Sequence, residues 1–199
     1  MTSSWKRLRH PIVIAGVCLA LGLLLAHQSG LRLNTTSSIP LGLYRMSHDP
    51  IVKGAYVLWC PPERQEFDLA KERGYIGAGF CPGGYGNMMK KVVASHDDVV
   101  SVTDAGVLIN GRLMPASQPV EADSLGRPLP RFRVTDHRLG PSEFLLMSDT
   151  NSRSFDARYF GFVHRTHIQS LIHPIWTWEW RRTFLFHSMA HGRPSNTGL

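Results

Sequence analysis

The chain has 199 residues, which is enough for one domain of ordinary size with short appendages. Hydrophobic residues make up 43% and charged residues 19%, which excludes a disordered chain, while 18 glycines and 13 prolines favour a β-rich body over a helical bundle. The net charge of +7 would suit nucleic acid or anionic lipid, but no nucleic-acid recognition motif is present, so we expect no nucleic-acid partner.

An apolar segment is the first predicted element. Residues 12–26 contain no charged or strongly polar side chain, and a basic stretch precedes them. A helix of this length covers about 22 Å, somewhat less than the hydrocarbon core of a bilayer. The basic flank predicts that residues 1–10 form a cytoplasmic tail and that residues 11–30 form a membrane anchor or signal segment, with the rest of the chain exported.

A cleaved signal peptide is the alternative interpretation of this segment. A cut after Ala26 would place Leu24 at the −3 position, where a small residue is needed. We therefore favour an uncleaved anchor, with the following domain exported. Cleavage would instead release that domain from the membrane.

The body of the chain is predicted to be one mainly β domain over residues 32–178. Its clearest element is the hairpin 107–114, because Asn110-Gly111 is the preferred two-residue hairpin turn. Residues 67–73 predict one short helix and residues 118–137 predict an irregular insertion. Residues 179–199 predict a basic tail that either lies on the membrane surface or is disordered, and we favour disorder. The other predicted strands cover residues 51–52, 55–59, 88–89, 92–93, 99–102 and 143–147.

Two of the three cysteines are candidates for a disulfide. Cys18 lies inside the apolar segment, whereas Cys60 and Cys81 lie in the exported part, where a disulfide can form and persist. A zinc site is not expected, because no Cys-x-x-Cys pair or nearby histidine accompanies them. His187 and His191 lack the glutamate of a zinc-protease motif, so we expect no metal there either.

Two short stretches carry candidate chemistry. Residues 34–44 read Asn-Thr-Thr-Ser-Ser-Ile-Pro-Leu-Gly-Leu-Tyr, in which a proline and a glycine favour a tight turn just beyond two serines. Residues 88–94 read Met-Met-Lys-Lys-Val-Val-Ala, and in an alternating strand the two lysines point to opposite faces. A lysine whose pKa is lowered by burial can deprotonate a serine hydroxyl, so together the stretches predict a serine/lysine peptidase.

From the anchor to about Trp178 the chain resembles the TraF branch of the signal peptidase I family, the conjugative-transfer peptidases. That branch carries an Asn-x-Thr-x-Ser-x-Pro-x-Gly-x-Tyr box, which residues 34–44 fit position by position. In this register the implied nucleophile is Ser38, whereas the spacing in general signal peptidases would select Ser37. The implied general base is Lys90, because a second basic residue, two aliphatic residues and an Asp-Val pair follow it, as in the family.

A third stretch, residues 147–161, resembles the third conserved box of the family. The resemblance implies that Ser154 orients the lysine amine. It also implies that Asp156 and Arg158 form an ion pair beneath the site, with Asp156 functionally essential in the TraF branch.

Two further features of the site follow from the same resemblance. The oxyanion donors would be the backbone N–H of Ser38 and the hydroxyl of Thr36. Ser148 stands where the family usually has glycine, while Asp149 keeps the usual aspartate.

The resemblance implies a signal-peptidase-like β-domain with one N-terminal anchor helix. The anchor would lie in the bacterial inner membrane with the domain in the periplasm, and cleavage of the anchor would release a periplasmic protein. The domain's activity would be maturation of an exported pilin precursor for conjugative transfer, through an acyl-enzyme resolved by hydrolysis or by cyclisation. The expected partners are that precursor, the inner membrane and the conjugative transfer machinery, and no cofactor is expected. Two alternatives remain: a general signal peptidase I that removes leader peptides from preproteins, and a non-catalytic component of a mating channel.

Overall fold

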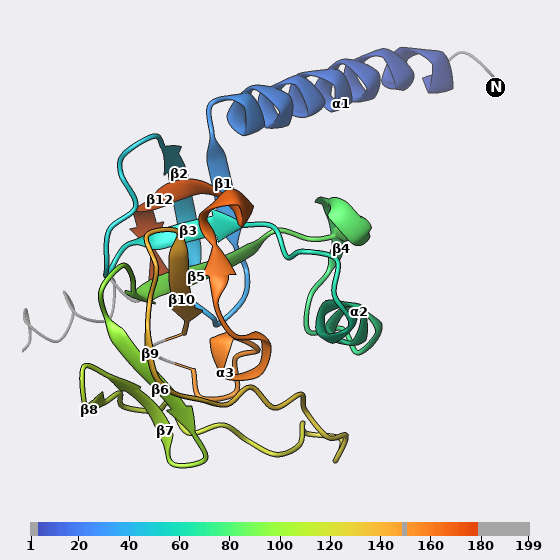
Figure 1. Ribbon diagram of the computed structural model, residues 1–199. Coiled ribbons are helices and arrows are strands. Elements are labelled where there is room, and N and C mark those ends of the chain that lie inside the picture. Colours follow the sequence, from blue (N-terminus) through green and yellow to red (C-terminus); the bar gives the residue numbers. More distant parts are fainter. Residues whose placement is uncertain (1–3, 149–150, 179–199) are drawn as a thin grey trace, which may run out of the picture.

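The computed structural model describes residues 4–148 and 151–178 and confirms a mainly β protein with one long N-terminal helix (Figure 1). Figure 1 shows a larger sheet next to the long helix and a smaller sheet at the opposite end of the body. The predictions for Asp149, for His187 and His191, and for the tail 179–199 lie outside the described residues.

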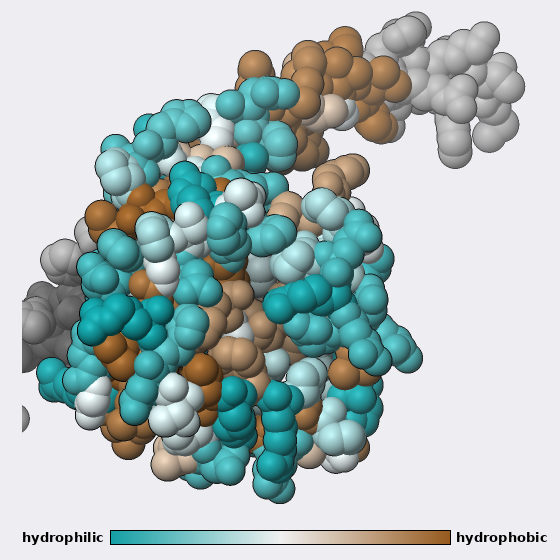
Figure 2. Space-filling view, viewed as in Figure 1, coloured by the Kyte–Doolittle hydropathy of each residue, from teal (hydrophilic) through white to brown (hydrophobic). Residues whose placement is uncertain are grey.

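Helix α1 (Ser4–Gln28) contains the predicted anchor. Its residues Pro11–Gln28 form an 18-residue candidate membrane span with a mean hydropathy of 2.0, and none of this span is buried in the rest of the chain. Figure 2 shows the span as an apolar rod that projects from a largely polar body. The helix already begins at Ser4, so most of the predicted tail 1–10 is helical, because lysine, arginine and leucine are good helix formers.

The larger sheet has seven strands, and every neighbouring pair is antiparallel. Strands that are distant in sequence become neighbours in it, since the last strand lies between the second and the third. In spatial order the strands are β1 (Leu31–Asn34), β2 (Gly42–Ser47), β12 (Ile168–Thr177), β3 (Tyr56–Trp59), β5 (Met88–Ala94), β10 (Glu143–Met147) and β11 (Val163–His164).

The smaller sheet has four strands and includes the predicted hairpin. Asn110 and Gly111 form its turn with positive φ angles of 52° and 75°, as a two-residue turn of this type requires. In spatial order the strands are β8 (Arg112–Leu113), β7 (Gly106–Ile109), β6 (Val99–Thr103) and β9 (Val134–Arg138). Strand β9 corrects the prediction of an entirely irregular insertion 118–137, because its backbone completes the free side of β6.

The remaining elements are short. The predicted helix 67–73 is present as α2 (Gln65–Glu72), which begins two residues earlier than predicted. The predicted strand 51–52 is wrong, because the backbone N–H of Ala55 donates to the carbonyl of Val52 and closes a turn there. The short elements are α2 (Gln65–Glu72), β4 (Ala78–Cys81), the 3₁₀ turn η1 (Pro82–Gly84), α3 (Ala157–Phe160) and the 3₁₀ turn η2 (Arg165–His167).

An aromatic cluster joins helices α2 and α3 to the larger sheet. Trp59 on β3 packs against Phe67 of α2 and Phe160 of α3, with ring centroids 5.8 and 5.2 Å apart, and all three side chains are buried. Aromatic pairs of this kind contribute large buried areas and specific ring geometry. The cluster therefore fixes α3, and the loop that precedes it, against the centre of the sheet.

The structure joins Cys60 and Cys81 by a disulfide, which ties the end of β3 to β4. A crosslink at a sequence separation of 21 residues restricts the unfolded chain, so replacing both cysteines by alanine should lower the free energy of unfolding by about 3 kcal/mol. Urea titration of the full chain in detergent would measure the loss. Cys18→Ala is the matched control, because Cys18 is a free cysteine on α1. Equal stability of the oxidised and the reduced wild-type chain would contradict the expectation.

Candidate active site

The loop between β1 and β2 carries the serine box and is organised by one side chain. Asn34, which is buried, donates from Nδ2 to the carbonyls of Thr36, Ile39 and Pro40 at 2.8–3.0 Å. Its Oδ1 accepts from the backbone N–H and the hydroxyl of Thr36, at 3.1 and 2.9 Å. Asn34 therefore satisfies the backbone on both sides of Ser38, which fixes the serine in one position.

Two further residues of the box hold the same loop from its far side. The Tyr44 hydroxyl donates to the carbonyl of Pro40 at 2.6 Å. Gly42 has a φ of 155° and lies against β12, where a Cβ atom would be 2.1 Å from the carbonyl oxygen of Trp176. Glycine is required there because no other residue fits between the strands, and this close approach brings the serine loop against the sheet.

Lys90 lies in the middle of β5 and is buried, with 1% of its side chain exposed. Its Nζ donates to Ser38 Oγ at 2.8 Å and to Ser154 Oγ at 2.5 Å, and the two serine oxygens are 3.1 Å apart. The neighbouring Lys91 is half-buried on the other face of the strand, with its ammonium 6.0 Å from the centre of the Tyr56 ring. The strand alternation that the sequence predicts thus separates the two lysines.

Burial lowers the pKa of Lys90 from its usual 10.5 to about 8. The Asp156 carboxylate opposes this shift, and the Arg158 guanidinium adds to it. A pKa near 8 leaves part of the amine neutral at physiological pH, and only a neutral amine can accept a proton. Lys90 therefore has both the position and the protonation equilibrium of a base for the Ser38 hydroxyl.

Ser154 is presented by a loop that a buried ion pair supports. Arg158 donates from Nε and Nη2 to the two carboxylate oxygens of Asp156, at 2.8 Å each, and neither side chain is exposed. Arg158 also donates to the carbonyls of Ser152 and Ser154, at 2.7 and 3.0 Å. A bidentate, fully desolvated pair of this kind fixes geometry, and here it fixes the backbone that carries Ser154.

Asp156 has a second structural role, as the N-cap of α3. Its carboxylate accepts from the backbone N–H of Arg158 at 3.2 Å and from that of Ser148 at 3.1 Å. These bonds join the start of α3 to the end of β10, next to β5 and Lys90 in the sheet. The predicted ion pair of Asp156 and Arg158 is therefore present beneath the lysine.

The structure also shows the contacts of three other residues in these boxes. Ser37 does not reach Lys90; its hydroxyl accepts from Asn151 Nδ2 at 2.8 Å, so the serine next to the lysine is Ser38. The Thr36 hydroxyl donates to Asn34, and must turn away from it before it can donate to an oxyanion. Ser148, at the usual glycine position, is buried and accepts from the backbone N–H of Asn151 at 2.9 Å.

Sequence reasoning missed two features of this site. Asn151 bridges the serine loop and the third box through Ser37, and Asn34 organises the whole serine loop. Both residues stand in the matched boxes, but their types alone do not reveal these contacts.

A cleft of about 210 Å³ opens at the serine and the lysine, and it is lined by Leu33, Asn34, Thr35, Thr36, Ser38, Tyr75, Ile76, Gly77, Asn87, Met88, Met89, Lys90 and Phe155.

The structure thus brings Ser38, Lys90 and Ser154 together, with the buried Asp156–Arg158 ion pair supporting the loop of Ser154. The model of the family "signal peptidase, peptidase S26" matches residues 6–178, and the chain therefore belongs to that family. Within the described residues 4–148 and 151–178, no group of three or more histidine, cysteine, aspartate or glutamate side chains is placed to hold a metal ion.

Proteins of conjugative transfer are among the relatives. A plasmid transfer protein TraF from Escherichia coli is 54% identical over 178 residues, which cover 89% of this chain and 100% of that protein. The conjugal transfer protein TraF of Agrobacterium fabrum is 32% identical over 83% of this chain and 93% of its own length. A solved structure of signal peptidase I from Enterococcus faecalis shows 16% identity and a TM-score of 0.35, over 63% of this chain and 98% of that chain.

Proposed function

We propose that this chain is a membrane-anchored serine endopeptidase that matures an exported pilin precursor during conjugative transfer. The observation that carries the proposal is the buried Lys90 amine, 2.8 Å from the Ser38 hydroxyl. The TraF relatives support a conjugative role, and the apolar span in α1 supports a membrane anchor. The basic residues that precede this span in the sequence support a catalytic domain on the periplasmic side.

In the proposed reaction, Ser38 Oγ attacks the carbonyl carbon of the scissile peptide bond while neutral Lys90 accepts its proton. The Ser38 backbone N–H stabilises the oxyanion, and the Thr36 hydroxyl joins it after turning from Asn34. Lys90 then returns the proton to the leaving amine, the C–N bond breaks and an ester to Ser38 remains. Ser154 holds the lysine amine in line throughout, at 2.5 Å.

The acyl-enzyme can be resolved in two ways. Water would hydrolyse the ester and release a linear product. The amino terminus of the same substrate chain would instead form a new peptide bond and release a cyclic product. In either case Lys90 takes a proton from the attacking group, and Ser38 leaves as the hydroxyl.

The intact mass of the pilin, with and without this chain in the same cell, tests the proposal. Maturation predicts a shorter product, and cyclisation predicts a further loss of one water, about 18 Da, relative to the trimmed linear chain. An ordinary preprotein with a cleavable leader is the comparison substrate. Cleavage of that preprotein without any change in the pilin would favour a general signal peptidase, and processing of neither would favour a non-catalytic channel component.

The pKa of Lys90 predicts how the rate depends on pH. Because the base works only when neutral and burial lowers its pKa to about 8, kcat/KM should rise about tenfold per pH unit below pH 7 and level off above pH 9. A pH series with a peptide or precursor substrate measures the inflection. Lys91→Ala is the matched control and should keep the inflection, because Lys91 lies on the other face of the strand. An inflection near pH 6.5 in the wild-type chain would point to a histidine base.

A further inference from the structure

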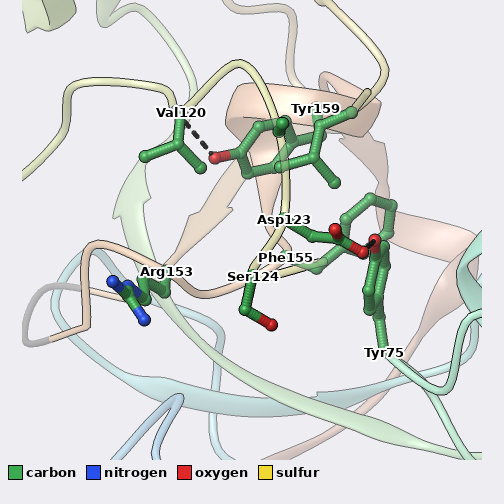
Figure 3. A pocket seen from close by; sticks show the side chains of 9 residues that line it. Tyr75, Val120, Asp123, Ser124, Arg153, Phe155 and Tyr159 are labelled. Atoms are coloured by element: carbon green, nitrogen blue, oxygen red, sulfur yellow. Dashed lines mark hydrogen bonds between the residues drawn. The ribbon is translucent and has the colours of Figure 1, made fainter. Parts of the chain in front are cut away.

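A second cavity, of about 320 Å³, lies beside the active-site cleft, and we call it the side pocket. This volume is at the lower end of the range for ligand-binding pockets. Figure 3 shows Tyr75, Phe155 and Tyr159 around it, with Ser124 pointing into the space between Arg153 and Tyr75. Its lining residues are Tyr75, Val120, Ala122, Asp123, Ser124, Leu129, Arg153, Phe155 and Tyr159.

The outer wall of the side pocket is the irregular segment 118–131, which hydrogen bonds hold at three points. The Tyr159 hydroxyl accepts from the backbone N–H of Val120 at 3.1 Å, and the Tyr75 hydroxyl donates to Asp123 at 2.5 Å. Arg73 donates to the carbonyl of Pro128 at 2.6 Å. The segment is therefore fixed over the aromatic rings of Tyr75, Phe155 and Tyr159. The side pocket thus has its shape before any ligand enters.

The side pocket and the active-site cleft share two walls, Tyr75 and Phe155. The three residues Arg153, Ser154 and Phe155 explain how the sites are connected. Ser154 bonds to Lys90, while the residues before and after it line the side pocket. A polypeptide bound at Ser38 would thus continue into the side pocket across these aromatic rings.

The charge of the side pocket favours one kind of ligand. Asp123 is already engaged by Tyr75 and by Arg127, whose Nε lies 2.7 Å from its carboxylate. Among the described residues, the Arg153 guanidinium makes no ion pair, and this exposed side chain stands at the edge of the pocket. An apolar interior with one available cation suits an apolar side chain that is accompanied by a carboxylate.

We propose that the side pocket is a substrate subsite that receives an apolar side chain of the precursor, while Arg153 binds a carboxylate of the same segment. The inference rests on the proposed peptidase function and adds a determinant of its specificity. It places the recognised side chain outside the residues that flank the scissile bond, because Tyr75 and Phe155 stand between the two cavities.

Ser124→Trp tests the subsite, because an indole at this position fills the pocket from its rim. Processing of the pilin precursor should lose at least tenfold in kcat/KM, while acylation of Ser38 by a small β-lactam probe stays at the wild-type rate. Leu125→Trp is the matched control, because Leu125 is 74% exposed on the same loop and does not line the pocket. The control should process the precursor normally.

An alanine scan of the precursor around its cleavage point identifies the occupant. Alanine at one apolar position of the precursor should lower kcat/KM about tenfold with the wild-type chain. The same substitution should cause no further loss with Ser124→Trp. Arg153→Ala should lower kcat/KM for precursors that carry the nearby carboxylate, and Arg153→Lys should restore part of the loss. Wild-type processing by Ser124→Trp would overturn the subsite and leave the peptidase intact. A wild-type chain that neither reacts with the probe nor processes the precursor would overturn both proposals.

Discussion

Replacing Ser38 by alanine should reduce precursor processing by at least about 10³-fold, because the proposed nucleophile is lost while the rest of the site remains. Its Oγ is the serine oxygen of the β1–β2 loop that lies 2.8 Å from Lys90. The processed fraction of the precursor, followed by intact mass over time, measures the rate. The variant should also fail to form the acyl adduct with a β-lactam probe.

The adjacent serine provides the matched control for this experiment. Ser37→Ala removes only a hydrogen bond to Asn151, so the rate should fall by less than about tenfold. Full activity of Ser38→Ala together with an inactive Ser37→Ala would reverse the assignment and favour the register of general signal peptidases.

Asp156→Ala should destabilise the fold by about 3–5 kcal/mol, since it leaves the Arg158 guanidinium buried without its partner. For a domain of this size the melting temperature should fall by about 10 °C. Circular dichroism of the full chain in detergent, with urea or heat, measures the change. Activity should fall as well at temperatures where the variant is folded, because Arg158 then no longer positions the loop of Ser154.

An exposed ion pair is the control for the buried one. Glu121 pairs with Arg131 at the surface, and both side chains are more than half exposed, so Glu121→Ala should change the free energy of unfolding by less than about 1 kcal/mol. If Asp156→Ala lowered the free energy of unfolding by no more than Glu121→Ala does, the buried pair would not support the fold.

The mainly β class, the apolar N-terminal helix and the Asn110-Gly111 hairpin could be predicted because each depends on a local pattern. The meeting of Ser38 with Lys90 could not be derived from such patterns. Their strands β1 and β5 are separated in the sheet by β2, β12 and β3, so the loop must fold back over the sheet face. The residue types suggested that the serine and lysine stretches act together, but only the resemblance to a family selected Ser38 and Lys90 within them. For the serine it did so in the register that the structure shows.

The side pocket could not be predicted for a different reason. Its outer wall has no periodicity, and it is formed by a few side-chain contacts such as Tyr75 with Asp123. These contacts join parts of the chain that are far apart in sequence, and tyrosine or aspartate in a loop carries no signal of its partner. Strand β9 was not predicted for a similar reason. Its apolar and polar residues alternate only weakly, and it forms a strand because it pairs with β6.

The junction between α1 and β1 limits how far from a bilayer this site can work. Only nine residues, which form a tight turn, strand β1 and the start of the β1–β2 loop, separate Gln28, at the end of the candidate span, from Ser38. That stretch reaches at most about 35 Å when fully extended, and it is shorter here because it folds against β2. With α1 in a membrane, this short connection holds Ser38 close to the lipid surface. Ser38 can then reach a scissile bond that lies near that surface, and it cannot reach one that a soluble protein presents farther from the membrane.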